Sequence, residues 1–120
     1  PSPALSLSLT DLAKARAQVQ QVHLAPELRD YIVRLVMATR EGPLAQDIEH
    51  AVSPRGSLSL AAASKARAFL HGRDFALPED VAALAGDALA HRMVLSWRAV
   101  ADGRRARDIV ADIINAVEPL

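Results

Sequence analysis

Apolar residues recur along most of the chain at the three- and four-residue spacing of an amphipathic helix. The clearest pattern lies in residues 26–42, where Pro26 suits the first helical position and Gly42 with Pro43 ends the helix. The members of its apolar stripe are Leu28, Ile32, Leu35, Val36 and Thr39. This segment is predicted to be a helix with one buried face.

One further helix is predicted before this one and one after it. Thr10 is a suitable N-cap for a helix over residues 11–22. The apolar positions of that helix near helical spacing are Leu12, Val19 and Val22. The next helix runs from about Pro54 to His71, with Gly72 as its C-terminal cap. Residues 43–52 between them are expected to form a connector.

The last third of the chain predicts two more helices. One begins at Pro78 and the other follows the turn at Asp102 and Gly103. The residues they are expected to bury are Val81, Leu84, Ala85, Ala88 and Leu89 in the first, and Ile109, Val110, Ile113, Ile114 and Val117 in the second. Residues 93–95 are predicted to be briefly extended, with residues 75–77 as their expected partner.

These elements predict an all-α fold, a bundle of about five helices with at most one short strand pair. Residues 1–9 are rich in serine and proline and are expected to be a flexible lead-in, followed by one helical domain over residues 10–120. A chain of 120 residues is long enough for a single core. Because 51% of its residues are hydrophobic but only 3% aromatic, that core consists of small and aliphatic side chains, which suit closely packed helices.

Charge and composition exclude several classes of binding partner and site. Fourteen basic residues balance fourteen acidic ones, so the basic surface that nucleic acids or anionic membranes require is not expected. The chain has no cysteine, which excludes disulfides and thiolate metal sites and fits a cytoplasmic setting. No apolar run approaches the roughly 18 residues of a spanning helix, and a signal peptide is not expected, because the first residues lack its charged-then-apolar layout. The chain begins with Pro1 rather than Met, as expected of a processed piece or an excised domain.

The sequence lacks the common motifs of nucleotide-binding, metal and acyl-transfer sites. It has no G-x-x-x-x-G-K-[ST] phosphate loop and no apolar strand ending in Asp-Glu, so the chain by itself cannot hold a nucleoside triphosphate with its Mg²⁺. Its histidines do not pair at the i, i+4 spacing of a helical metal site, and no G-x-S-x-G elbow surrounds Ser53, Ser57 or Ser64. The four histidines are His23, His50, His71 and His91. Neither a metal site nor acyl-transfer chemistry is therefore expected.

The stretch Ser53-Pro54-Arg55 is the one motif that indicates a specific chemical role. Ser53 can cap the following helix, and Pro54 can fill its first position. Arg55 then lies in the first turn, where the helix dipole disfavours a cation by about 0.3–1 kcal/mol. A phosphate in front of the helix would reverse that penalty. The alternative interpretation is an ion pair from Arg55 to Glu49 or Asp47.

Several motifs together resemble the C-terminal helical lid of MoxR-type AAA+ ATPases over residues 10–97. They occur in the family's order and near its spacing. The matching pieces are Tyr31 with Ala38-Thr39-Arg40, Ser53-Pro54-Arg55, Gly72-Arg73-Asp74, Pro78-Glu79-Asp80-Val81 and His91-Arg92. The chain departs from the family pattern at Ala51-Val52, where Gly-Ala is usual, and at Leu77, where a threonine cap is usual. We expect the first departure to alter the loop that precedes Ser53. The second removes a cap and should destabilise the helix that begins at Pro78 by about 1 kcal/mol.

The resemblance implies that ATP and Mg²⁺ lie between an α/β core domain of the same polypeptide and this lid. It makes Arg55 the sensor-2 arginine that reaches the γ-phosphate, with Ser53 and Pro54 setting its position. Leu58 either walls the adenine or, as the preferred interpretation, packs in the core. The resemblance further implies a chaperone-like homo-hexameric ring that hydrolyses ATP and remodels complexes, possible partners of the von Willebrand factor A type, and no hydrolysis by this chain alone.

The remaining family-typical residues have structural and functional interpretations. Thr39 and Arg40 could touch nucleotide or a neighbouring subunit, although a helix C-terminus also favours a cation through its dipole. The pairs Arg73-Asp74 and His91-Arg92 are expected to tie the third predicted helix to the fourth. Residues 109–117 are expected to be core or a subunit contact.

Two functions from other classes compete with the ATPase lid. A helical adaptor would bind a partner through the stripe at residues 109–117 and would not respond to nucleotide. A helix-turn-helix DNA-binding domain is disfavoured by the zero net charge.

Overall fold

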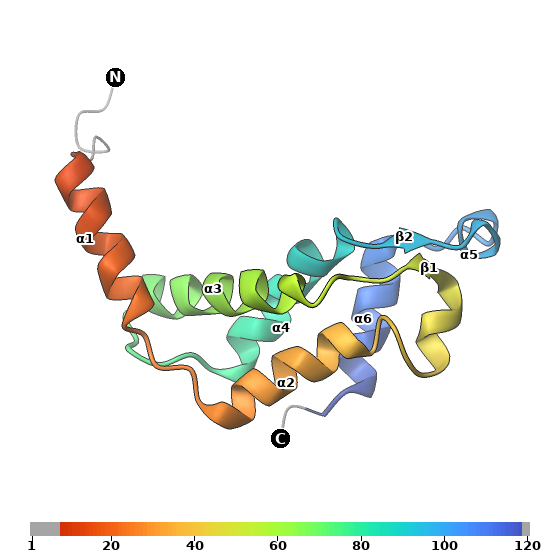
Figure 1. Ribbon diagram of the computed structural model, residues 1–120, viewed down its shortest axis with the longest axis horizontal. Helices are drawn as coiled ribbons and strands as arrows, with labels where there is room; N and C mark the ends of the chain where they lie inside the picture. Colours follow the sequence, from red (N-terminus) through yellow and green to blue (C-terminus); the bar gives the residue numbers. More distant parts are fainter. Residues whose placement is uncertain (1–7, 119–120) are drawn as a thin grey trace.

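The computed structural model describes residues 8–118 and shows a helical bundle with one short strand pair (Figure 1). The elements in chain order are α1 (Leu9–Gln20), α2 (Pro26–Met37), the 3₁₀ helix η2 (Pro43–Asp47), β1 (Ile48–His50), α3 (Arg55–Leu70), α4 (Pro78–Ala90), β2 (Val94–Leu95), α5 (Trp97–Ala101) and α6 (Ala106–Ala116). The predicted all-α fold is confirmed, and so are the helices predicted near residues 26, 54, 78 and 106.

Helix α4 lies at the centre of the packing. It packs along α3 on one side and against α6 on the other, while α2 covers α3 (Figure 1). The large side chains that are fully buried, at under 2% exposure, come from all of these helices: Tyr31, Ile32, Leu35, Leu60, Leu89, Ile109 and Ile113 among them. Burial of these aliphatic side chains, rather than helix propensity, holds the bundle together.

Helix α2 follows its predicted stripe closely. Leu28, Ile32, Leu35 and Val36 are buried, as is Thr39 just beyond the helix, and Pro26 lies at the first helical position. The helix ends at Met37, five residues before the predicted stop at Gly42, which has φ 90°, a left-handed conformation that other residues rarely adopt.

Helix α3 ends in a Schellman motif at its predicted glycine cap. Gly72 has φ 75°, and its N–H donates to the carbonyl of Phe69 at 2.9 Å. The N–H of Arg73 donates to the carbonyl of Ala68, also at 2.9 Å. This turn sends the chain back toward the start of α4 and carries Arg73 with it.

The strand pair differs from the expected one. Residues Val94–Leu95 do form a strand, but it pairs antiparallel with Ile48–His50 of the connector and not with residues 75–77. Phe75 instead forms an isolated bridge with His23. Both pairings join segments that are distant in sequence, so no local pattern could select between them.

Helix α1 starts earlier and is more exposed than predicted. Ser8, and not Thr10, is its N-cap, since the Ser8 hydroxyl accepts from the N–H of Asp11 at 3.0 Å. None of its residues is buried, and Leu12 is 41% exposed. The helix angles away from the body in Figure 1. Of the expected lead-in at residues 1–9, residues 1–7 lie outside the described residues.

Helix α5 was absent from the sequence prediction. It has five residues, and the Ser96 hydroxyl caps it by accepting from the N–H of Ala99 at 3.2 Å. A helix of five residues is too short for a helical period to be recognised in the sequence, and only Ala99 of it is buried.

Candidate functional site

Arg55 opens helix α3, where the three residues of the Ser-Pro-Arg motif form a tight turn. The Ser53 hydroxyl accepts from the N–H of Arg55 at 3.3 Å, and the Ser53 carbonyl accepts from the N–H of Gly56 at 2.7 Å. Pro54 already has helical angles, φ −53° and ψ −24°. Ser53 thus bonds to the backbone of this turn, but α3 starts at Arg55 with Pro54 in the N-cap position, one residue later than predicted, and no side-chain hydrogen bond caps it.

The side chain of Arg55 is exposed and makes no ion pair within residues 8–118. The alternative pairing with Glu49 or Asp47 is thus not found in the structure. The first turn of α3 contains no acidic residue that would offset the cation. A guanidinium at the positive end of a helix dipole, without a carboxylate, is a favourable place for an external anion.

The residue just before the motif is held by the end of α2. The Thr39 hydroxyl accepts from the N–H of Val52 at 3.2 Å and donates to the carbonyl of Val36 at 2.6 Å. The Arg40 Nε donates to the Val52 carbonyl at 3.2 Å. Thr39 and Arg40, which we call the Val52 clamp, therefore fix both backbone polar groups of Val52. These contacts join residues 12 and 13 positions apart, so they could not be predicted from local sequence patterns.

Gly56 lets α3 approach Val52 closely. The Val52 side chain is fully buried, and a Cβ on Gly56 would lie 2.4 Å from the Val52 Cγ1. Such a distance is far shorter than carbon atoms tolerate, so only glycine fits at position 56 unless Val52 moves. The departure from the family pattern at Val52 is accommodated in this way, because the larger side chain fills the space that Gly56 leaves.

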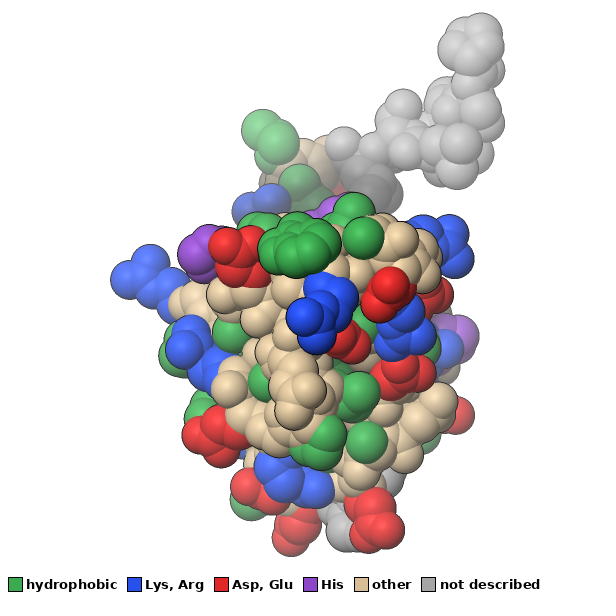
Figure 2. Space-filling model, turned by 90° about the vertical axis from the view of Figure 1, so that its right-hand side faces the viewer, with side chains coloured by type: hydrophobic (Ala, Val, Ile, Leu, Met, Phe, Trp, Pro, Cys, Tyr) green, Lys and Arg blue, Asp and Glu red, His purple; other side chains and the backbone are tan. Residues whose placement is uncertain are grey.

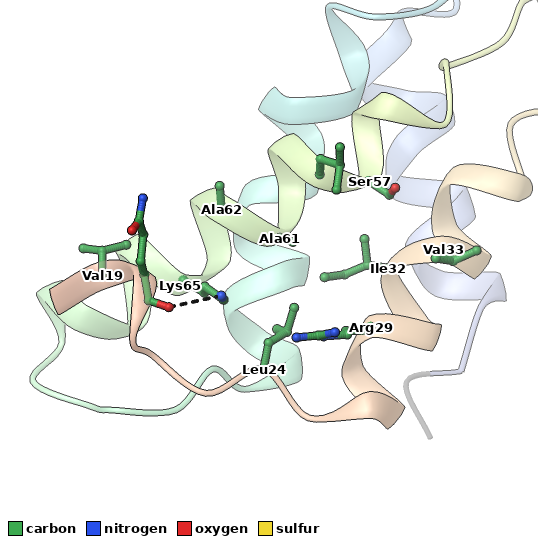
Figure 3. Close-up of a pocket in the computed structure, with 11 residues that line it drawn as sticks. Val19, Leu24, Arg29, Ile32, Val33, Ser57, Ala61, Ala62 and Lys65 are labelled. Atoms are coloured by element: carbon green, nitrogen blue, oxygen red, sulfur yellow. Dashed lines mark hydrogen bonds between the residues drawn. The ribbon is translucent and has the colours of Figure 1, made fainter. Parts of the chain in front are cut away.

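Leu58 lines the mouth of an apolar groove. Its side chain is 72% exposed, so the expectation that Leu58 packs in the core is wrong. The groove has a volume of about 470 Å³ and lies between α1, α2 and α3. Figure 3 shows Ile32 and Ala61 on facing walls and two cationic side chains, Arg29 and Lys65, at its edge. The groove starts two residues after Arg55, at Ser57 of α3.

A second arginine reaches the same end of α3. The Arg92 Nη2 donates to the Ser59 hydroxyl at 3.0 Å, and its Cδ lies near Gly56. This contact confirms that Arg92 ties the segment after α4 to α3. The side chain of His91 makes no hydrogen bond or ion pair in the part of the chain that the structure describes.

The opposite end of α3 holds a buried charge cluster. Asp80 of α4 has a fully buried side chain that accepts from Arg67 at 2.5 Å and from both Nη atoms of Arg73 at 2.7 Å. It also accepts from the N–H of Leu77 at 2.7 Å, which caps α4 although Leu77 itself offers no side-chain oxygen. Burial alone raises the pKa of Asp80, but these hydrogen bonds outweigh it and lower the pKa to about 2. The predicted tie between the two helices is confirmed for Arg73, while Asp74 contributes only a backbone carbonyl, to His23.

Other candidate sites have no support in the geometry. Among residues 8–118, no group of three or more histidine and acidic side chains could hold a metal ion. None of the helices described is both long and apolar enough to cross a bilayer. The stripe on α6 is core, since Ile109, Val110 and Ile113 are fully buried, and it is unavailable as the adaptor surface considered above.

The end of the molecule around β2 and α5 carries three exposed apolar side chains close together in sequence. Trp97 is 79% exposed, Val100 60% and Val94 51%. In Figure 2, which shows this end, hydrophobic side chains lie among cationic and anionic ones, and neither sign of charge gathers in one patch. This face therefore lacks the basic surface that nucleic acids require.

Comparisons with known proteins agree on one family. The family model described as the AAA lid domain matches residues 38–113. The uncharacterized protein YeaC of Bacillus subtilis is 39% identical over 108 residues, covering 90% of this chain and 33% of that protein. Chaperone MoxR1 of Mycobacterium tuberculosis is 32% identical over 117 residues, covering 92% of this chain and 31% of that protein.

A solved structure supports the same relationship. The crystal structure of a "putative ATPase" from Cytophaga hutchinsonii superposes with a TM-score of 0.85 at 34% identity, covering 91% of this chain and 35% of that one. The chain thus spans about a third of the length of the relatives it matches.

Proposed function

Because this chain belongs to the AAA lid domain family, as the C-terminal lid of a MoxR-type AAA+ ATPase, we propose that it closes over ATP bound to an α/β core. On this proposal the lid moves according to whether the γ-phosphate is present. The parent protein hydrolyses ATP with Mg²⁺ and works as a cytoplasmic, chaperone-like homo-hexameric ring that remodels protein complexes, with von Willebrand factor A-type proteins as candidate partners.

The observation that carries the proposal is the environment of Arg55. It is exposed, lies in the first turn of α3 and has no ion pair within the described residues. The free energy that a helix loses by placing a cation there is recovered when an anion binds in front of it. Arg55 therefore acts as the sensor-2 arginine toward the γ-phosphate, and Ser53 and Pro54 shape the turn that presents it.

Leu58 supports the proposal from the adjoining surface. Its exposed side chain lies three residues after Arg55 and therefore on a neighbouring position of the same helix face. An apolar side chain next to a cation suits a ligand with a flat base and a charged phosphate. We assign Leu58 to the wall of the adenine site.

Replacing Arg55 in the full-length protein tests the proposal. Arg55→Ala is expected to lower the rate of ATP hydrolysis by about 10- to 1,000-fold, because it removes a charge-assisted contact that strengthens in the transition state. Arg55→Lys is expected to recover only part of the rate, since an ammonium does not reproduce the planar guanidinium. Steady-state ATPase assays measure both.

A matched control is Arg98→Ala, which removes the same charge from another exposed position, on α5. It is expected to keep the rate of the unchanged protein. If Arg55→Ala hydrolyses ATP at the full rate, Arg55 is not a sensor and the proposed function is wrong.

The 120-residue chain alone is proposed to be inactive, because the core would supply the phosphate loop and the Mg²⁺ ligands. One arginine and a helix end offset only part of the entropy of association, so ATP should bind with a Kd of about 1 mM or weaker. Isothermal titration calorimetry measures this constant. Micromolar binding, or turnover above a buffer blank, would contradict this assignment.

A further inference from the structure

Val52 lies three residues before Arg55, and both of its backbone polar groups are hydrogen-bonded. Its N–H and its carbonyl are both bonded to the Val52 clamp, at 3.2 Å in each case. Its side chain is fully buried against Gly56. A buried N–H that loses its acceptor carries the full free-energy penalty of its desolvation, so this position of Val52 is favoured over one that breaks the bond to Thr39.

The chain between Val52 and Arg55 is also constrained. The ring of Pro54 fixes its φ, and Ser53 bonds to the backbone of both Arg55 and Gly56. The position of Val52 therefore sets the direction in which the Arg55 side chain points from the start of α3. That position in turn depends on the end of α2, through Thr39 and Arg40.

A direct role for Thr39 at a ligand is excluded by its burial. Its side chain is 1% exposed, and its hydroxyl is already a donor to Val36 and an acceptor from Val52. The Arg40 Nε is likewise engaged by the Val52 carbonyl. Both side chains act on the backbone that precedes Arg55.

We propose that Thr39 and Arg40 are positioning residues, which aim Arg55 at the γ-phosphate by holding Val52 in place. This inference deepens the proposed function and rests on it. It assigns to the end of α2 a role in ATP hydrolysis that, for the buried Thr39, involves no contact with the nucleotide.

Amide hydrogen exchange on the 120-residue chain tests whether the clamp holds Val52. In Thr39→Val, which keeps the shape but removes the hydroxyl, the Val52 amide is expected to exchange at least about tenfold faster. Thr39→Ser keeps the hydroxyl and should restore slow exchange. Thr10→Val, the same change at an exposed position of α1, should have no effect. Unchanged exchange in Thr39→Val would overturn the proposal.

ATPase assays on the full-length protein test whether the clamp acts through Arg55. Thr39→Val is expected to lower kcat by about 3- to 10-fold with a smaller change in the KM for ATP, because misaiming a group costs rate more than binding. Arg40→Ala, which changes an exposed side chain, should behave alike, and Arg40→Lys should recover part of the rate.

The decisive measurement combines these variants with Arg55→Ala. If the clamp works by aiming Arg55, Thr39→Val causes no further loss once Arg55 is absent. Losses that multiply in the double variant would overturn the clamp proposal. A full rate in Thr39→Val beside a defective Arg55→Ala would also overturn it while leaving the proposed function intact. A full rate in Arg55→Ala would overturn both.

Discussion

At the carboxyl end of α3, Arg67 and Arg73 both donate to the buried carboxylate of Asp80, whereas at the amino end Arg55 has no ion pair among the described residues. The helix dipole adds to this difference, because it favours Arg67 in the last turn and disfavours Arg55 in the first. One end of the helix thus satisfies its cations within the fold. The other leaves a cation to be satisfied from outside.

The comparison separates residues that stabilise this protein from residues that are held for function. A cation that is both paired and favoured by the dipole contributes to folding. A cation that is unpaired and disfavoured does not, and its retention at a rigid turn is better explained by an anionic ligand. The two ends should therefore respond in opposite ways to substitution.

The largest effect on stability is expected at the buried end. Asp80→Asn removes the charge that Arg67, Arg73 and the start of α4 share, and should lower the free energy of unfolding by about 3 kcal/mol. Urea denaturation measures this value. The control Asp87→Asn removes a carboxylate that pairs with Arg107 at the surface, where both side chains are 63% exposed, and should cost less than about 1 kcal/mol. Equal losses in the two variants would contradict the comparison.

The next effect is a loss of stability in acid. The pKa of Asp80 is about 2 in the folded protein, below the ordinary value of 3.8 for an aspartate side chain. Its contribution is therefore fully present above about pH 4 and is lost as the pH falls toward 2, by on the order of 2 kcal/mol. Urea midpoints at pH 5 and pH 2.5 measure the loss, which should be smaller by this amount in Asp80→Asn. The same loss in both proteins would show that other carboxylates cause it.

A smaller effect is expected when one arginine of the buried cluster is removed. Arg67→Ala takes away one of the donors to Asp80, while Arg73 and the Leu77 N–H remain. The unfolding free energy should fall by about 1–2 kcal/mol, the usual value for a hydrogen bond to a charged group. Thermal and urea unfolding followed by circular dichroism provide the measurement. No loss at all would mean that Arg73 and the Leu77 N–H together satisfy Asp80.

The smallest effect should have the opposite sign. Arg55→Ala in the 120-residue chain is expected to leave the unfolding free energy unchanged or to raise it by up to about 1 kcal/mol, because a cation leaves the positive end of a helix. Thermal and urea unfolding followed by circular dichroism measure this change in the unfolding free energy. A clear destabilisation would show that Arg55 serves the fold, and the contrast between the two ends of α3 would fail.

Most of the helical framework could be predicted from the sequence. The α2 stripe, the prolines that open α2 and α4, and the glycines Gly42 and Gly72 are local signals, and each one appears in the structure near the expected place. The misplaced start of α1 was also readable, because Ser8 with Asp11 three residues later is a capping pattern. Local signals failed for α5, whose five residues are too few to show a helical period, and for the partner of β2.

The candidate site was predicted only in part. Arg55 stands out in the sequence because a cation follows a cap and a proline, and that arrangement is local. The burial of Leu58 was predicted wrongly, since periodicity identifies an apolar face but not whether another element covers it. The roles of Thr39, Arg40 and Gly56 were not predicted, because each depends on a contact with Val52.

The sequence by itself determined the approximate positions of the described helices other than η2 and α5, and that Arg55 stands at a helix start, because these depend on residues within a turn or two of one another. Only the tertiary structure decided that Asp80 would gather two arginines, that β2 would pair with β1, and that the end of α2 would hold Val52. These contacts join residues 7 to 47 positions apart. They form only when the apolar faces of the helices have packed, and that packing is a property of the whole chain.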